Sequence, residues 1–327
     1  TALIEVKHLT KRYGSHTAVS DLSFTVEKGQ IYGFLGPNGA GKTTTMNILT
    51  GYLSATGGSA KIAGIDILEN PMEAKKHIGF LPEHPPLYQD MTVKEYLNFV
   101  YNLKKCTLNR KAHLGEICEV IRIEDVYKRP ISHLSKGYRQ RVGIAQALIG
   151  NPDVLIFDEP TVGLDPKQII EIRNLITGLG KKHTIILSSH ILPEVQSVCG
   201  RIVIINKGKI VADAKTDELD VLTGSRKLVA KITGKPQETV NLLSSIPGVT
   251  ACEQLPERDG DAYAFLLESQ NDVDIRKMLF TKVASNGRFL VGLEPVGANL
   301  EDVFITLTGA PSDTAPDSQS TEGGKTE

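Results

Sequence analysis

The sequence lacks an excess of charge of either sign. Its 327 residues carry 37 lysine and arginine side chains against 38 aspartate and glutamate side chains, for a formal net charge of −1. A strongly basic surface is what draws a protein to nucleic acid or anionic lipid without specific contacts. Bulk electrostatics therefore gives no reason to expect a nucleic-acid partner, and any partner must be recognised by shape.

Long apolar runs are also missing. No stretch approaches the roughly 20 apolar residues that a transmembrane helix needs. Residues 1–6 lead directly into a strand-like pattern and lack the basic, apolar and small-residue regions of a signal peptide. We therefore expect no membrane span, and a role in any membrane event from the cytoplasmic side.

Cysteines are few and scattered. The four are Cys106, Cys118, Cys199 and Cys252, with no Cys-x-x-Cys pair and no histidine at metal-ligand spacing. This pattern argues against a disulfide scaffold or a structural zinc site and is typical of reduced, cytosolic thiols.

Length and pattern indicate two domains. A chain of 327 residues exceeds the usual span of one domain. Residues 1–222 begin with alternating apolar and polar positions, typical of half-exposed antiparallel strands. Helical spacing over about 92–150 predicts a helical insertion, and the apolar runs at 154–157 and 184–187 predict buried parallel strands of an α/β domain.

The pattern changes near residues 222–225, and residues 226–309 form the second predicted domain. Its expected elements have the order βαββαβ of a ferredoxin-like α+β unit, at 228–232, 237–245, 249–255, 263–268, 273–284 and 289–293. A last amphipathic helix is expected at 299–307, with Leu300, Val303, Phe304 and Leu307 on one side. Residues 310–327 have almost nothing to bury, so a disordered tail is predicted.

A phosphate-binding loop follows the apolar run at 30–35 and precedes a helical pattern. It fits Gly-x-x-x-x-Gly-Lys-[Ser/Thr] in full, and the strand-loop-helix context disfavours a chance glycine-rich turn. Its glycines let backbone amides turn toward phosphates, Lys42 neutralises the β and γ phosphates, and Thr43 offers a hydroxyl to Mg²⁺. The residues predicted to hold the nucleotide are Gly36, Pro37, Asn38, Gly39, Ala40, Gly41, Lys42, Thr43 and Thr44.

Two carboxylates end the apolar run at 154–157. Asp158 is expected at the tip of a buried strand, where it would hold the Mg²⁺ hydration shell, and Glu159 would orient or deprotonate the attacking water. The alternative for Asp158 is a simple cap of the following turn.

Between these elements, Leu134-Ser135-Lys136-Gly137-Tyr138 opens a helical pattern. It resembles the signature motif Leu-Ser-Gly-Gly-Gln of ATP-binding cassette (ABC) ATPases, whose serine and second glycine contact the γ-phosphate of ATP held by the opposite subunit. Ser135 and Gly137 match this motif. Lys136 and Tyr138 depart from it, and Lys136 adds a positive charge where phosphate would arrive.

The resemblance assigns roles to four further residues. His190 matches the switch histidine that contacts the γ-phosphate, Asp165 matches the D-loop at the subunit seam, and Tyr13 matches the aromatic residue that stacks on adenine. The alternatives are that His190 is a surface or core histidine, that Asp165 caps a helix, and that Tyr13 only packs against its neighbours. Glu83 stands where the family usually has the Q-loop glutamine; its carboxylate can still accept from Mg²⁺-bound water, so it is assigned to catalysis and to the metal.

The wider resemblance is to the cytosolic ATPase subunits of bacterial exporters, grouped with gliding-motility and multidrug or antibiotic efflux systems. It covers residues 1–222 by motif and 226–309 by arrangement. It implies a P-loop NTPase fold, ATP and Mg²⁺ as cofactors, and a second nucleotide-binding subunit, with a homodimer expected. It also implies an integral membrane permease subunit, through which this chain would lie peripherally at the cytoplasmic face of the inner or plasma membrane. For the C-terminal domain it leaves open contact with the partner cassette, regulation of closure, or support of the fold.

Two other functions compete with this interpretation. A soluble ABC ATPase acting on nucleic acid or ribosomes generally carries two cassettes, coiled-coil arms or basic tracts, whereas this chain has one cassette and short charge pairs such as Lys104-Lys105. A kinase or GTPase would have no role for residues 134–138.

Overall fold

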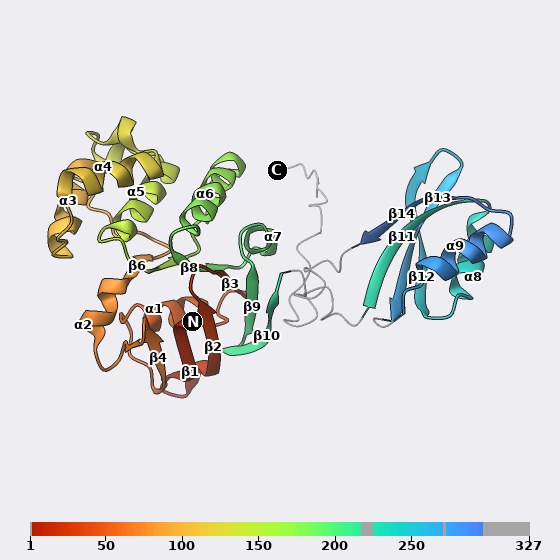
Figure 1. Cartoon of the computed structure of the whole chain (residues 1–327), viewed down its shortest axis with the longest axis horizontal. Helices are drawn as coiled ribbons and strands as arrows, with labels where there is room; N and C mark the ends of the chain where they lie inside the picture. The colour runs from red at the N-terminus through yellow and green to blue at the C-terminus, as the bar shows by residue number, and fades with distance from the viewer. Residues whose placement is uncertain (1, 217–224, 271–272, 297–327) are drawn as a thin grey trace, which may run out of the picture. The chain divides into compact units, whose positions relative to one another are not determined.

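The computed structural model of the chain describes residues 2–216, 225–270 and 273–296 (Figure 1). The chain divides into two compact units, Thr1–Leu219 and Asp220–Glu327. The helix expected at 299–307 and the tail expected at 310–327 lie outside the described residues. None of the helices in the described ranges combines the length and hydropathy needed to cross a lipid bilayer.

The first unit begins with an antiparallel sheet of order β2-β1-β4-β5. The strands are β1 (Ala2–Tyr13), β2 (His16–Glu27), β4 (Gly57–Ile62) and β5 (Ile65–Asp66). Alternate residues of β2 are buried, as period-two patterning predicts for a sheet with one covered face. The antiparallel β subdomain predicted from the sequence is therefore present.

The second sheet of this unit has six strands in the order β10-β9-β3-β8-β7-β6. They are β3 (Ile31–Leu35), β6 (Ile78–Leu81), β7 (Val154–Asp158), β8 (Thr184–Ser189), β9 (Arg201–Asn206) and β10 (Lys209–Lys215). All neighbours are parallel except β9 and β10. Every residue of β7 and β8 is buried, as expected for parallel strands covered on both faces, and the α/β class is confirmed.

One hydrophobic core joins the two sheets. Phe24 of β2 stacks on Tyr32 of β3, with 5.7 Å between ring centroids, and contacts Phe34 at 5.4 Å. Met46 of the helix after β3 is fully buried in the same cluster. This core fixes the antiparallel sheet beside the loop that follows β3.

Several helices of the first unit start at side-chain caps. The helices are α1 (Lys42–Leu49), α2 (Pro71–Ala74), η1 (Lys75–His77), α3 (Val93–Leu103), α4 (Arg110–Ile121), η2 (Glu124–Val126), η3 (Ile131–His133), α5 (Lys136–Leu148), α6 (Pro166–Leu179) and α7 (Leu192–Gln196). Thr92 and Glu95 form a reciprocal capping box before α3, and Asn109 caps α4. Helices α3, α4 and α5 lie together (Figure 1) and make up the predicted helical insertion.

The second unit contains β11 (Ser225–Thr233), α8 (Pro236–Ser244), β12 (Val249–Asp259), β13 (Ala262–Gln270), α9 (Arg276–Ser285) and β14 (Leu290–Val296). Its antiparallel sheet has the order β12-β13-β11-β14. Leu243 of α8 and Leu279 of α9 share one core with Ile232 and Phe265 of the sheet, so both helices cover the same face. The element order is that of a split βαβ unit.

Several boundaries in the second unit differ from the sequence-based prediction, and local chemistry explains two of them. Helix α9 starts at Arg276, not at 273, because the Asp274 carboxylate accepts the Arg276 amide at 3.1 Å and forms a turn before the helix. Strand β12 continues past residue 255 to Asp259. It accommodates Pro256 on an edge strand through a register shift between Gln254 and Arg258.

Candidate functional site

Three adjacent parallel strands bring the predicted phosphate-handling residues to one edge of the central sheet. Leu35 at the end of β3 pairs with Ser189 of β8, and Asp158 at the end of β7 pairs with Ser188. The carboxyl ends of β3, β7 and β8 therefore lie side by side. This edge is where open α/β sheets bind their ligands.

The loop from Gly36 to Gly41 requires glycine at two positions for steric reasons. A Cβ atom on Gly36 would lie 2.4 Å from the Ile205 carbonyl oxygen, and one on Gly41, which has φ 104°, would lie 2.6 Å from the Ala18 carbonyl oxygen. The loop backbone is thus pressed between β2 and β9. Helix α1 starts at Lys42, and its first amide groups have no partner within the helix.

Lys42 and Glu159 form a buried ion pair beneath this loop. The Lys42 Nζ lies 3.3 Å from Glu159 Oε1, with both side chains about 5% exposed, and it also donates to the Gly36 carbonyl at 2.7 Å. The other carboxylate oxygen, Oε2, lies 2.9 Å from His190 Nδ1. The two residues predicted for catalysis, Glu159 and His190, are therefore in direct contact.

The backbone at Glu159 is left-handed, with φ 49°, which is uncommon for a residue other than glycine. Ser188 supports this conformation, since its carbonyl and its hydroxyl oxygen both accept the Glu159 amide, at 3.2 and 3.0 Å. Strained backbone that neighbouring groups hold in place is typical of functional sites. The sharp turn directs the carboxylate back toward Lys42.

Asp158 is buried behind Glu159. Its Oδ1 accepts the Ser188 hydroxyl. Burial raises the pKa of Asp158, while the Ser188 and Thr43 hydroxyls lower it. Its other oxygen, Oδ2, is one of two buried side-chain polar atoms without a hydrogen-bond partner in the described part of the chain.

This unpartnered oxygen of Asp158 indicates whether the site suits Mg²⁺. A buried oxygen without a partner costs free energy unless something binds it, and a carboxylate beside a threonine hydroxyl supplies the hard oxygen ligands that Mg²⁺ takes. Among the described residues, no group of three or more His, Cys, Asp and Glu side chains makes a metal site by itself. Mg²⁺ usually binds through one or two carboxylates together with substrate phosphates, so the residues present fit this metal.

A cavity of about 570 Å³ opens above these groups. Predicted residues that line it are Tyr13, Asn38, Gly39, Gly41, Lys42, Thr43, Thr44, Glu83, Glu159 and His190. Gly36, Pro37 and Ala40 lie in the loop below the cavity. The Gly36 and Pro37 carbonyl oxygens accept hydrogen bonds from the Lys42 ammonium. Tyr13 is 49% exposed at the end of β1, which leaves a ring face accessible to a planar base.

Sequence reasoning missed three residues that line the cavity, namely His16, Ala18 and Val162. His16 and Ala18 come from β2, which the core holds against the loop. No motif marks them, because their position depends on packing between two sheets. Within this hairpin, only Tyr13 was predicted from the sequence to contact a nucleotide.

Ser135, Gly137 and Asp165 do not line this cavity. Ser135 caps α5 by accepting the Tyr138 amide at 3.3 Å, and Asp165 caps α6 by accepting the Gln168 amide at 2.9 Å. A Cβ atom on Gly137 would lie 2.8 Å from the Gln168 amide carbon. The signature segment and the start of α6 therefore pack together as a second surface of the same unit.

The two departures in the signature segment have structural partners. The Tyr138 hydroxyl donates to Asp125 Oδ2 at 2.7 Å. The Lys136 ammonium lies across the D-loop, 2.0 Å from where a Cβ atom on Gly163 would be. The Lys136 side chain therefore lies close to Gly163, in the segment that precedes Asp165 of the same chain.

Comparison with known proteins gives one family match and several similar relatives. Residues 19–162 match the model of the ABC transporter family. The bacitracin transport ATP-binding protein BcrA of Bacillus licheniformis is 40% identical over 221 residues, which cover 67% of this chain and 72% of that protein. The Nod factor export ATP-binding protein I of Ralstonia nicotianae is 33% identical over 330 aligned positions, covering 94% of each chain.

Solved structures show the same similarity in three dimensions. The ATP-binding subunit of an ABC transporter matches with a TM-score of 0.62 and 30% identity, over 68% of this chain and 93% of that one. A bacterial ABC transporter cassette solved as a dimer matches with a TM-score of 0.60 and 25% identity, over 65% of this chain and 98% of that one.

Proposed function

Because this chain belongs to the ABC transporter family as an ATP-hydrolysing, nucleotide-binding subunit, we propose that it drives a bacterial exporter from the cytoplasmic face of the membrane. Two copies would close around two ATP molecules and move a separate integral membrane subunit. One relative supports export in particular, since it is named for Nod factor export, and another is named for bacitracin transport.

One observation carries the proposal of a composite site. Ser135, Gly137 and Asp165 lie outside the cavity formed by the phosphate loop, although the resemblance assigns them to nucleotide contacts. A second copy of the chain resolves this, since its signature segment would contact the γ-phosphate held by the first. ATP would then stabilise the closed pair and hydrolysis would release it.

The ion pair between Lys42 and Glu159 places the proposed base beside the phosphate-binding loop. The Glu159 carboxylate lies 3.3 Å from the Lys42 ammonium, the group that would contact the β and γ phosphates. Glu159 would accept a proton from the attacking water, while His190 keeps its Oε2 in place.

Thr43 and Asp158 would hold Mg²⁺, with Glu83 accepting from a metal-bound water. When bound, the metal supplies positive charge that neutralises phosphate oxygens during phosphoryl transfer. The surroundings of Asp158 prepare it for this role, since the Ser188 hydroxyl occupies Oδ1 and leaves Oδ2 available.

The Ser135→Arg substitution tests the composite site. In a Glu159→Gln background, which favours the ATP-bound dimer, we expect Ser135→Arg to leave the protein monomeric. The arginine side chain is larger than serine and would occupy the space in which Ser135 would contact the γ-phosphate held by the partner. Size-exclusion chromatography with light scattering in Mg-ATP measures this. Ser54→Arg, at an exposed position after α1, is the matched control and should still dimerise; a dimer in both variants would refute the composite site.

The Glu83→Gln substitution tests the unusual residue after β6. Glu83 is exposed and lines the nucleotide cavity, where its carboxylate adds negative charge near three phosphates. We expect glutamine to lower the Mg²⁺ dependence of ATP hydrolysis several-fold, because ATP no longer needs the metal to offset that charge. Titration of activity against Mg²⁺ at fixed ATP measures this, with the exposed Glu69→Gln as control. An unchanged Mg²⁺ profile would remove Glu83 from the metal site.

The membrane partner would dock on the helical insertion near the segment after β6. Exposed apolar side chains are present there: Tyr88 is 50% exposed and Leu103 is 68% exposed. The Tyr88 ring packs edge-on against Phe99 of α3, with 5.3 Å between centroids, which fixes its position. Co-purification of an integral membrane protein with the full chain from detergent tests the export proposal, whereas recovery of ribosomes or DNA would favour the alternative function.

A further inference from the structure

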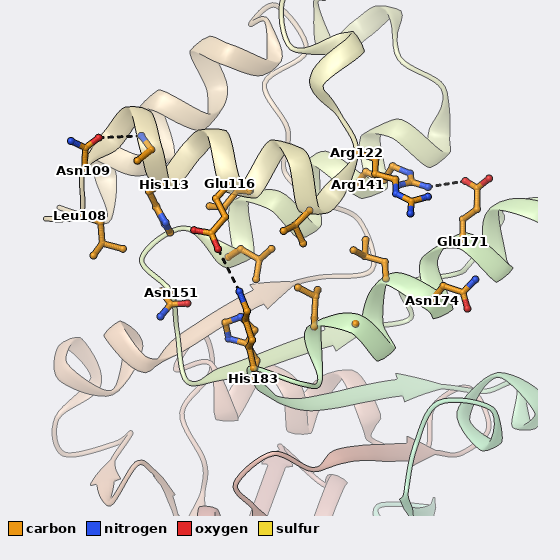
Figure 2. Close-up of a pocket in the computed structure, with 18 residues that line it drawn as sticks. Leu108, Asn109, His113, Glu116, Arg122, Arg141, Asn151, Glu171, Asn174 and His183 are labelled. Carbon is orange, nitrogen blue, oxygen red and sulfur yellow. Dashed lines mark hydrogen bonds and ion pairs between the residues drawn. The ribbon is translucent and has the colours of Figure 1, made fainter.

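A second cavity, of about 800 Å³, lies between α4 of the helical insertion and α6 of the core (Figure 2). Helix α5 forms its floor through Arg141 and Leu148. None of the residues assigned to the nucleotide or the metal lines it. Its volume is within the range of small-molecule sites, about 300–1,000 Å³.

The middle of this cleft is apolar. Ile117 and Val120 of α4 face it on one side, and Leu175 and Leu179 of α6 face it on the other. Gly178 also lines it, and a Cβ atom added there would meet no atom within 4 Å. The cleft therefore has room for an apolar chain along α6.

One end of the cleft carries more positive charge than negative. Arg141 donates to Glu171 Oε2 and to the Ile121 carbonyl, both at 2.7 Å. Arg122 directly follows Ile121, lines the same cavity, and has no side-chain hydrogen bond or ion pair among the described residues. Figure 2 shows both arginines at the end where Glu171 lies. Arg122 is exposed, and two guanidinium groups with one carboxylate give this end of the cleft a net charge of +1 that an anion could match.

The other end is polar. His183 is 6% exposed, and its Nδ1 donates to the Pro152 carbonyl at 2.7 Å. His113 accepts the Gly150 amide through Nε2 at 3.0 Å, and burial lowers the pKa of His113. The charges of Lys182 and Glu116 offset one another across 3.5 Å.

We propose that this cleft binds an amphipathic monocarboxylate, with its carboxylate on Arg122 and its alkyl chain between α4 and α6. A guanidinium fork matches a carboxylate with two parallel hydrogen bonds, and a single unmatched charge fits a monoanion. The apolar side chains of α4 and α6 would contact the alkyl chain of the ligand. The ligand would contact α5 and α6, the helices that Ser135 and Asp165 cap, and so would be placed to alter ATP turnover.

Octanoate and 1-octanol test the site by calorimetric titration of the full chain. They share an alkyl chain and differ in the carboxylate. We expect octanoate to bind wild type at least about tenfold more tightly than octanol, as expected for a hydrogen-bonded charge. Arg122→Gln should abolish this preference without weakening octanol binding, whereas Arg122→Lys should retain part of it.

A second substitution probes the apolar part independently of charge. Gly178→Leu fills the open space on α6 and should weaken both ligands by about tenfold or more, whereas Gly178→Ala should change neither appreciably. Unchanged ADP binding shows that each variant is folded. Equal affinity of wild type for octanoate and octanol, octanoate binding unaffected by Arg122→Gln, or octanoate binding unaffected by Gly178→Leu would each overturn the proposal. Because binding is measured without ATP hydrolysis, the result is independent of the exporter proposal.

Discussion

Replacing Glu159 with glutamine is expected to slow ATP hydrolysis by about 10²–10⁴-fold, the usual contribution of a general base. Glutamine keeps the shape of the side chain, so His190 and the left-handed turn at residue 159 can retain their positions. It removes the group that accepts the proton from water. It also removes the negative charge 3.3 Å from Lys42, so ATP binding should be preserved or tightened.

The measurement combines a phosphate-release assay with size-exclusion chromatography in Mg-ATP. The variant should retain ATP and accumulate as a dimer, because in the proposed cycle ATP binding closes the pair and hydrolysis reopens it. Glu253→Gln, on the exposed strand β12, is the matched control and should hydrolyse ATP at the wild-type rate. A wild-type rate in Glu159→Gln would exclude this residue as the base, and a monomer in Mg-ATP would count against the paired cassettes.

Replacing Lys42 with methionine is expected to weaken nucleotide binding by about a hundredfold. Each charge-assisted hydrogen bond to phosphate contributes about 1.5–3 kcal/mol, and the ammonium faces more than one phosphate. Methionine keeps most of the apolar stem but leaves the buried Glu159 carboxylate without its cation. That uncompensated charge would repel the phosphates as well, which enlarges the effect.

Nucleotide binding is measured with a fluorescent ADP analogue, since the chain contains no tryptophan to report on the site. Lys61→Met, on the exposed side of β4, controls for the loss of one positive charge. Adding Glu159→Gln to Lys42→Met should recover part of the affinity, because it removes the repelling carboxylate. Binding as tight as wild type in Lys42→Met would show that this ammonium does not contact phosphate.

The phosphate loop and the paired carboxylates were predictable because each lies within one strand-loop-helix segment. Phosphate binding requires particular residue types at short spacing, and the buried strand before each motif sets the direction in which these residues project. The contact between Glu159 and His190 joins residues from different segments. No motif predicts this contact, because it depends on β7 and β8 being neighbours in the sheet.

Features set by packing between distant segments were not predictable in the same way. His16 and Ala18 enter the nucleotide cavity because aromatic packing fixes β2 beside the loop, and neither belongs to a motif. The cleft between α4 and α6 depends on how the helical insertion meets the core. Nothing in the sequence distinguishes Arg122 from other surface arginines, because the residues that line the cleft with it come from distant segments.

Local chemistry also overrode periodicity at some boundaries. Hydrophobic spacing placed the start of α9 at 273, but the Asp274 side chain competes for the first amides and delays the helix. Hydrogen bonding by short polar side chains is a local effect that apolar periodicity does not register.

The buried pair of Lys42 and Glu159 also bears on selectivity. Because the ammonium already has a counterion within the chain, 3.3 Å away, inorganic phosphate or sulfate would gain little by replacing the carboxylate. A nucleotide would also offer a ring to Tyr13 and several phosphates to the loop amides. We therefore expect the site to discriminate against simple anions and in favour of nucleotides.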